Sequence, residues 1–332
     1  MKNTPLTSSE IANLWSQYIN DSLSICVIKH GLQVMEDKEI RSIYEQALQL
    51  SIHHIETVSK ILKQENLAVP VGFTDEDVHV EAPRLFSDPF LLYYLYTMTI
   101  HGLSGYNLAI ATSTRKDIRQ HFIQSNTTAT ELYDRITDVL LSKGIYSRPP
   151  FIPYDHVDFV KSHNFITGWF GERRPLNAIE INHIFFNLKK SAMAKVIAMG
   201  FSQVARDVEV VNFLINAADI AQKHIEIFTS VLQVDDLPSP TQWDSDVTTS
   251  TVSPFSDKLM MYLLGFLFQT SVAYYGTALA TSMRPDIATH YTRIIAEDLK
   301  EGKDWANIMI KNGWLEQVPQ APDRIAIAKE KK

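Results

Sequence analysis

Apolar residues recur at helical spacing through most of the chain. Residues 38–63 carry an apolar stripe separated by three or four positions, which places it on one face of an α-helix: Ile43, Ala47, Leu50, His54 and Val58. Before it, Thr7-x-x-Glu10 has the spacing of a capping box at a helix start, and apolar positions at helical spacing follow. The pattern predicts a first helix that begins after Thr7, a short turn at Asp37, and a second helix that ends near Lys63.

Two further helices are predicted in the same half. Ser87 is a natural N-cap for the uncharged stretch 89–114. A fourth helix is predicted from about Arg115 to Gly144, because glycine favours the left-handed backbone that follows many helix ends. Between helices 2 and 3, residues 67–84 contain prolines and a glycine and predict a long connection.

The second half of the chain repeats the first. His54-Ile55-Glu56 recurs as His224-Ile225-Glu226, 170 residues later. Beyond the long connection the offset is 169, and residues 112–121 match 281–290 with Thr, Ser, Arg, Asp, Ile and His in the same places. So many matches in order, with one gap, indicate a duplication. We expect two domains, residues 1–165 and 166–332.

The connection lengths predict the topology of each repeat. Helices 1 and 2, and helices 3 and 4, are joined by short turns and should be antiparallel. Helices 2 and 3 are joined by roughly twenty residues, enough to travel the length of a bundle and leave these helices parallel. The expected fold is therefore all-α: two tandem ferritin-like four-helix bundles, each with a long crossover between helices 2 and 3.

The third helix has no charge on any face in either repeat, so we expect it to be covered twice. The two bundles would then meet through their third helices, where small residues allow close approach: Ser104, Gly105, Ala109, Ala273, Gly276 and Ala280. Residues 259–283 are long enough to span a bilayer, but polar residues interrupt them, which favours a buried helix over a membrane helix.

Charge and cysteine content narrow the partners and the compartment. The formal charge of −7 and the absence of a dense Lys/Arg cluster argue against a nucleic-acid partner. Cys26 is the only cysteine, so no intramolecular disulfide can form, and the N-terminus has no continuous apolar signal segment. We expect a cytoplasmic protein without membrane contact, with a protein partner or homo-oligomer left open.

Four motifs carry a resemblance to a known family. Two are short, Leu-x-x-x-Glu-Ile near the start and Arg284-x-Asp286-Ile287, and two are longer: Pro70-x-Gly72-Phe73-Thr74-x-x-Asp77-Val78 and Gly313-Trp314-Leu315-Glu316-Gln317-x-Pro319-Gln320-Ala321. They resemble an uncharacterised family of bacilli, the family of unknown function 3231, whose members are often described as spore-coat-protein-like. The resemblance covers nearly the whole chain and implies a tandem ferritin-like fold and spore association, but no reaction. The last of these motifs is intact once, because Ile145-Tyr146-Ser147 follows the glycine of the first copy.

The sequence departs from the ligand pattern of di-iron bundles. Such bundles need Glu-x-x-His on two helices, and helices 2 and 4 lack it in both repeats. Glu180-x-x-His183 fits the spacing on the first helix of the second repeat, but Asn13 stands at the position of His183 in the first. There is also no phosphate-binding glycine loop or serine elbow. We assign no catalytic residue, and the pattern leans against an enzyme.

A weaker constellation recurs at one end of both bundles. Two imidazoles with carboxylates can bind iron or zinc, and each repeat supplies such a set: His54, His121, Glu10 and Asp117 in the first, and His224, His290, Glu180 and Asp286 in the second. Helix capping and first-turn charge explain the carboxylates equally well. Two hypotheses follow: a structural or interaction protein, which we favour, and a metal-binding protein with one site per repeat.

Overall fold

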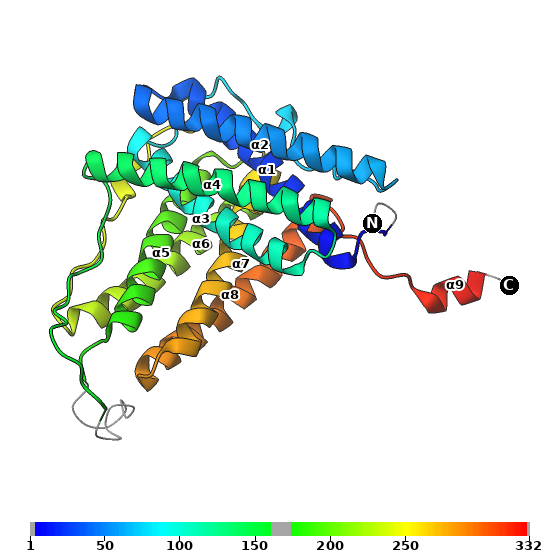
Figure 1. The fold of residues 1–332 in the computed structure, drawn as a ribbon. Helices are drawn as coiled ribbons and strands as arrows, with labels where there is room; N and C mark the ends of the chain where they lie inside the picture. The colour runs from blue at the N-terminus through cyan, green and yellow to red at the C-terminus, as the bar shows by residue number, and fades with distance from the viewer. Residues whose placement is uncertain (1–3, 161–173, 331–332) are drawn as a thin grey trace.

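The computed structural model describes residues 4–160 and 174–330, which form α-helices joined by loops, with isolated β-bridges as the described extended pairing (Figure 1). The first half contains α1 (Ser8–Val34), α2 (Lys38–Gln64), α3 (Asp88–Thr112) and α4 (Lys116–Ser142). The second contains α5 (Ala178–Val204), α6 (Val208–Gln233), α7 (Asp257–Thr281) and α8 (Pro285–Lys311), followed by the short α9 (Arg324–Glu330). The all-α prediction is confirmed.

Residues that the sequence pattern assigns to helix ends do fix them. The Thr7 hydroxyl accepts a hydrogen bond from the Glu10 amide while the Glu10 carboxylate accepts one from the Thr7 amide, and Asn177 makes the same box in α5. Gly144 and Gly313 each have a φ of +68° just after α4 and α8, a backbone conformation that favours glycine. The predicted capping boxes and terminal glycines are confirmed.

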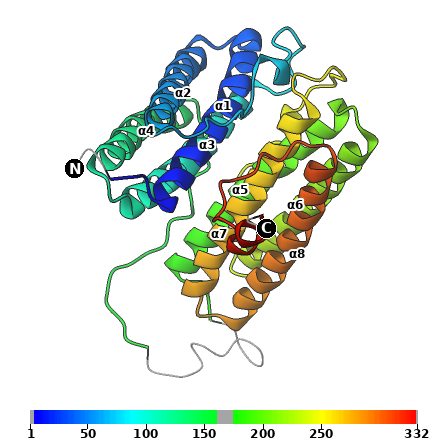
Figure 2. The same ribbon diagram turned by 90° about the vertical axis from the view of Figure 1, so that its right-hand side faces the viewer.

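Each half is a bundle of four helices. In the first half α1 packs against α2, α3 packs against α4, and these pairs meet through α1 with α3 and α2 with α4; α5–α8 repeat this scheme. Figure 2 shows the two groups as separate bundles that lie side by side. The predicted boundary between residues 165 and 166 falls outside the described residues and stays a prediction. No described helix is long and apolar enough to cross a membrane.

The two halves are joined by reciprocal hydrogen bonds in which an aspartate of each half binds the N-cap serine of a helix in the other. We call these contacts the clasp: Asp77 with Ser256, and Asp246 with Ser87. Asp77 lies in the connection between α2 and α3, and its carboxylate accepts from the hydroxyl of Ser256, the N-cap of α7, at 2.7 Å. In the second half Asp246 accepts from the hydroxyl of Ser87, the N-cap of α3. The backbone repeats the exchange, because each serine amide donates to the aspartate carbonyl at 3.0 Å. Each repeat therefore holds the N-cap residue of a helix in the other repeat.

A second pair of contacts involves the two longer family motifs, residues 70–78 and 313–321. The Glu316 carboxylate accepts from the amides of Val71 and Gly72 at 3.1 Å each. At the equivalent place in the other half, the Ser147 hydroxyl accepts from the amide of Thr241 at 3.0 Å. The first copy thus replaces the glutamate by a shorter acceptor, so the signature can be incomplete there while its contact persists.

The third helices contact each other through Ser104, one of the predicted small residues, but its partner is a tyrosine and the predicted glycines do not take part. Tyr274 of α7 lies against α3, where its hydroxyl is 3.0 Å from the Ser104 hydroxyl. Ala273 and Ala280 are exposed, and a Cβ added to Gly105 or Gly276 would meet no atom within 4 Å. The expected close approach is wrong because bulky aromatic side chains mediate the contact, which leaves this stretch of the helix surfaces apart.

The clasp predicts an unequal effect of two neighbouring aspartates. Asp77→Ala leaves the half-buried Ser256 hydroxyl without its acceptor and removes the acceptor of the Thr74 amide in its own turn, so we expect the free energy of unfolding to fall by about 1–3 kcal/mol. Asp75→Ala, at an exposed site two residues before Asp77 in the same turn, should change it by less than about 0.5 kcal/mol. Urea denaturation of both variants measures this, and equal losses would contradict the role of the clasp.

Candidate functional site

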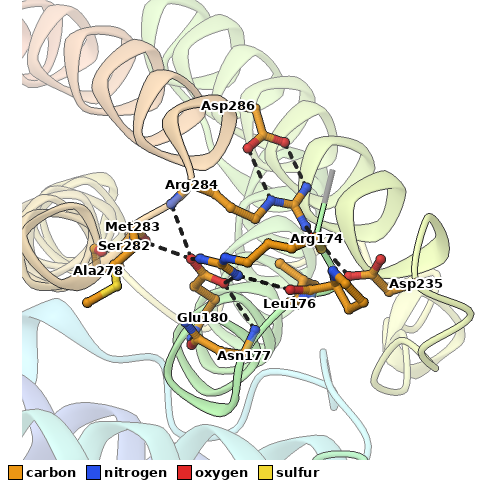
Figure 3. Close-up of polar contacts among 11 residues, drawn as sticks. Arg174, Leu176, Asn177, Glu180, Asp235, Ala278, Ser282, Met283, Arg284 and Asp286 are labelled. Atoms are coloured by element: carbon orange, nitrogen blue, oxygen red, sulfur yellow. Dashed lines mark hydrogen bonds and ion pairs between the residues drawn. The ribbon is translucent and has the colours of Figure 1, made fainter. Parts of the chain in front are cut away.

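Four of the predicted metal ligands lie at helix starts and are held by arginine and backbone amides. In the second repeat, Figure 3 shows the Glu180 carboxylate bound by both arms of the Arg174 guanidinium, at 2.8 Å each, while Arg284 binds Asp286 at 2.8 and 3.2 Å. Burial opposes the ionisation of Glu180, but the Arg174 guanidinium and backbone amides outweigh it and hold the pKa below its usual value.

The first repeat has the same arrangement with different donors. Glu10 accepts from the amides of Thr114 and Arg115 at 2.8 and 2.7 Å, and Arg115 binds Asp117 at 2.7 Å. Arg115 also binds Glu65 at 2.7 Å, a position that Asp235 takes in the second repeat, 3.6 Å from Arg284. These carboxylates therefore anchor the start of the fourth helix on the first and second helices, as the capping alternative expects.

The structure brings His54 and His121 together. Their ring centroids are 6.2 Å apart. His54 Nδ1 is 3.0 Å from the carboxylate of Asp21 and 3.4 Å from the Tyr106 hydroxyl, and His121 Nε2 is 2.7 Å from Gln17 Oε1. Burial, followed by the nearby His54, lowers the pKa of His121 to about 4.

Asp21 is a site residue that the sequence reasoning missed. It lies on α1, is 8% exposed, and its carboxylate is hydrogen-bonded to His54. The repeat comparison hides it, because Ser191 stands at its position in the second half. Its spacing of four from the buried Gln17 is the signal that could have placed both residues on the inward face of the helix.

In the second repeat the carboxylate comes from the opposite helix. His224 Nε2 lies 3.4 Å from Glu297, and Nδ1 lies 4.0 Å from Asp298. Both acids are on α8, where the first repeat has Thr128 and Ala129. Burial lowers the pKa of His224 to about 4, against the attraction of Glu297. His290, the remaining predicted ligand, is half-buried on α8. Among the described side chains, no group of three or more His, Cys, Asp or Glu could hold a metal ion.

A cavity of about 320 Å³ lies among the helices of the first bundle and includes His54 in its lining. Its polar lining contains Asp21, Gln17 and Ser51, and its mouth lies between α1 and α3 at the exposed Ser16 and Gly105. The rest is largely apolar: Ile28, Leu50, Leu95, Met98, Leu108, Phe122, Leu132 and, from the second repeat, Phe266. This is the chemistry of a small-molecule site, with apolar walls and a few polar groups. We call it the first cavity.

The second repeat has a cavity at the same place that is almost closed, at about 20 Å³. Every residue that lines it, from Ser191 to Asp298, corresponds to a lining residue of the first cavity. The difference arises at the mouth, where Ser16, Asn20 and Gly105 of the first repeat are replaced by larger residues: Phe186, Lys190 and Tyr274. The rings of Phe186 and Tyr274 lie 5.0 Å apart, and Lys190 Nζ lies 4.4 Å from the Tyr274 ring centroid. These three side chains close the second bundle.

His101 connects the first cavity to this closure. Its Nδ1 is 3.3 Å from the Tyr274 hydroxyl, which is 3.0 Å from Ser104, which in turn donates to the carbonyl of Ile100. All three bonds can form together only if Tyr274 donates to Ser104 and His101 donates to Tyr274, because each hydroxyl has one hydrogen. The proton is then on Nδ1. Burial, with a smaller contribution from Lys190, lowers the pKa of His101 to about 3.

Comparison with known proteins gives a family and one structure. The family model described as Protein of unknown function (DUF3231) matches residues 1–156 and 164–327. A crystal structure of a protein from Bacillus halodurans C-125, named a "putative spore coat protein", aligns with 18% sequence identity and a TM-score of 0.41. The alignment covers 46% of this chain and 99% of that one, and its TM-score is too low to carry an argument. No curated protein matches the sequence.

The buried His101 predicts a specific loss of stability in acid. The unfolded chain takes up this proton below about pH 6.5, whereas the folded chain does so only near pH 3, so the free energy of unfolding should fall as pH falls through this window. His101→Gln keeps a donor for Tyr274 but cannot titrate. We expect its stability relative to the parent to improve on acidification, by at most about 1.4 kcal/mol per pH unit. Denaturation at pH 7, 6, 5 and 4 measures this difference, and a constant difference would contradict it.

Proposed function

Because the chain belongs to the DUF3231 family of proteins of unknown function, a membership that brings no activity with it, we propose a function from the geometry of its own residues. The protein is a binding module that holds one small molecule in the first cavity. The second repeat serves as its closed structural partner. The observation that carries this proposal is the contrast between two equivalent places in one chain, about 320 Å³ in the first repeat and about 20 Å³ in the second.

An open cavity weakens a bundle, which is why the contrast supports a function. Cavity volume in a protein core costs about 24 cal/mol per Å³, and polar groups that line it lose partners. In the second repeat larger side chains occupy the same space, with Phe186, Lys190 and Tyr274 at the mouth and Phe268 in the lining. The first repeat instead has Ser16, Asn20 and Gly105 there, and it has Thr99 at the position of Phe268. A bound molecule would fill the first cavity and offset the loss of stability that the cavity causes.

The two-repeat scaffold is proposed to have the ferritin-like topology, in which residues 65–87 cross over between α2 and α3. The length of that connection and the helix bounds on either side support this assignment. The scaffold serves as an interaction module in this proposal, with the ligand as its signal or its cargo. Cytoplasmic location stays a prediction from the cysteine content and the N-terminal sequence, and spore association stays a prediction from the family resemblance.

A metal ion is the second candidate ligand, and one observation favours it in the first repeat. His54 and His121 lie 6.2 Å apart, and no hydrogen bond engages His54 Nε2 among the residues that the structure describes. A neutral imidazole whose Nδ1 donates to Asp21 presents Nε2 as a metal ligand. Iron or zinc would then sit between the two rings, with water at the open position.

Filling the mouth tests the binding proposal. Ser16→Phe together with Gly105→Tyr reproduces the closure of the second repeat, and the Gly105 site has room for a side chain. In protein labelled at its methionine methyl groups, we expect at least one of three small probes to shift the Met98 signal saturably: 2-phenylethylamine, 2-phenylethanol or phenylacetate. The filled variant should bind that probe at least tenfold more weakly. Asn107→Tyr, a substitution at an exposed site on α3, should leave the affinity unchanged. Shifts that survive filling would contradict the proposal.

Elemental analysis tests the metal candidate. Protein purified without an affinity tag or chelator should carry near-stoichiometric iron or zinc if the candidate is correct. His54→Ala and His121→Ala should each remove the metal, because both imidazoles are needed. His224→Ala is the matched control in the second repeat and should leave a first-repeat metal in place. Less than about 0.1 metal per chain in the parent would contradict metal binding.

A further inference from the structure

We propose that the ligand of the first cavity is an organic monoamine, with its ammonium group beside Asp21 and an apolar body against the cavity walls. The inference rests on the proposed function of the first cavity and adds the chemical class of the ligand. It comes from a comparison of the two repeats, because the second repeat already holds an alkylamine at the corresponding place.

That amine belongs to Lys190. The lysine side chain is 4% exposed, and its Nζ lies 3.3 Å from the Ser271 hydroxyl and 4.4 Å from the centroid of the Tyr274 ring. Burial lowers the pKa of Lys190 to about 7, and the carboxylate of Asp298, a residue of α8 that is 3% exposed, acts against this shift. The second bundle therefore surrounds an amine with an aromatic ring, a hydroxyl and an acid, and the chain itself supplies the amine.

The first repeat keeps the acid and lacks the lysine. Asn20 stands at the position of Lys190, and Gly105 stands at that of Tyr274, so the first repeat has neither the amine nor the aromatic ring at this place. The carboxylate has moved from α8, where Ala129 is the first-repeat counterpart of Asp298, to Asp21 on α1. Each bundle thus has an acid beside its histidine, but only in the second does an amine of the same repeat lie near it.

The lining of the first cavity selects a hydrogen-bond donor. Asp21 Oδ1 has no hydrogen bond among the described residues, because the contact with His54 uses Oδ2. His54 Nε2 is likewise an acceptor when Nδ1 donates to Asp21. An ammonium group has three donors and no acceptor, so it suits both atoms, whereas a carboxylate or phosphate ligand would repel Asp21.

The charge balance and the walls define the rest of the ligand. Within the described part of the chain, Asp21 is the only formally charged side chain other than histidine that lines the cavity, and no lysine or arginine does. Tyr106, Phe122 and Phe266 offer ring surfaces that attract cations and apolar groups. The opposite end of the molecule meets aliphatic and aromatic side chains and has no second carboxylate to bind. A monoamine with an aromatic or branched aliphatic body meets these conditions, and a polyamine does not.

The test compares three probes of nearly one size and shape at one pH. They are 2-phenylethylamine, 2-phenylethanol and phenylacetate, titrated into full-length protein and followed at the Met98 methyl signal, with Met260 and Met261 of the second repeat as internal references. We expect the amine to bind at least tenfold more tightly than the alcohol, and phenylacetate to bind most weakly. Asp21→Asn retains an acceptor for His54 and should reduce the amine to the affinity of the alcohol without weakening the alcohol.

A second variant tests the comparison between repeats directly. Asn20→Lys gives the first repeat the equivalent of Lys190, so its own ammonium group should occupy the site and reduce amine affinity at least tenfold. Asn20→Gln is the uncharged control of similar length and should retain more of the binding. If the alcohol binds as tightly as the amine, or Asp21→Asn and Asn20→Lys leave the preference unchanged, the amine inference is overturned while the cavity remains a binding site. If none of the probes shifts Met98, both proposals fail.

Discussion

The arrangement of the two bundles depends on the clasp, the reciprocal hydrogen bonds between the loop aspartates of each repeat and the N-cap serines of the other. Asp77 and Asp246 each accept from the N-cap serine of a helix in the other repeat, so each bundle holds the N-cap residue of a helix in its partner. The two bundles are thereby fixed relative to each other, and this places α7 against α3. The wall of the first cavity is consequently completed by Phe266, a residue of the second repeat.

Two copies held in one such frame have been free to diverge in their interiors. The second has become a compact support in which Lys190, Phe186 and Tyr274 occupy the mouth. The first has small residues there and a polar floor with His54, Asp21 and Gln17. Tyr274 links the two repeats, because it lies at the closed mouth of the second bundle and accepts a hydrogen bond from His101 of the first. A ligand that moved His101 would act on the closed repeat through this side chain.

Local sequence signals predicted most of the fold and little of the site. Capping boxes at Thr7 and Asn177, serine N-caps and terminal glycines gave helix bounds to within a few residues, because each of these effects depends on neighbours along the chain. Small residues predict a close approach of the third helices, but Tyr274 contacts Ser104 instead, since uncharged helix faces do not reveal which side chains meet. The repeat identifies His54 and His121 but not Asp21, because Asp21 stands at a position where the two repeats differ.

The most direct measurement is a crystal structure of the full-length protein grown with 2-phenylethylamine at a concentration that saturates the Met98 shift. We predict one amine per chain, between α1 and α3 of the first repeat, with its nitrogen within about 3.2 Å of Asp21. The second repeat should contain no amine and should show Lys190 beneath the Tyr274 ring. An amine bound only on the surface, or equally in both bundles, would contradict the account of one open and one closed repeat.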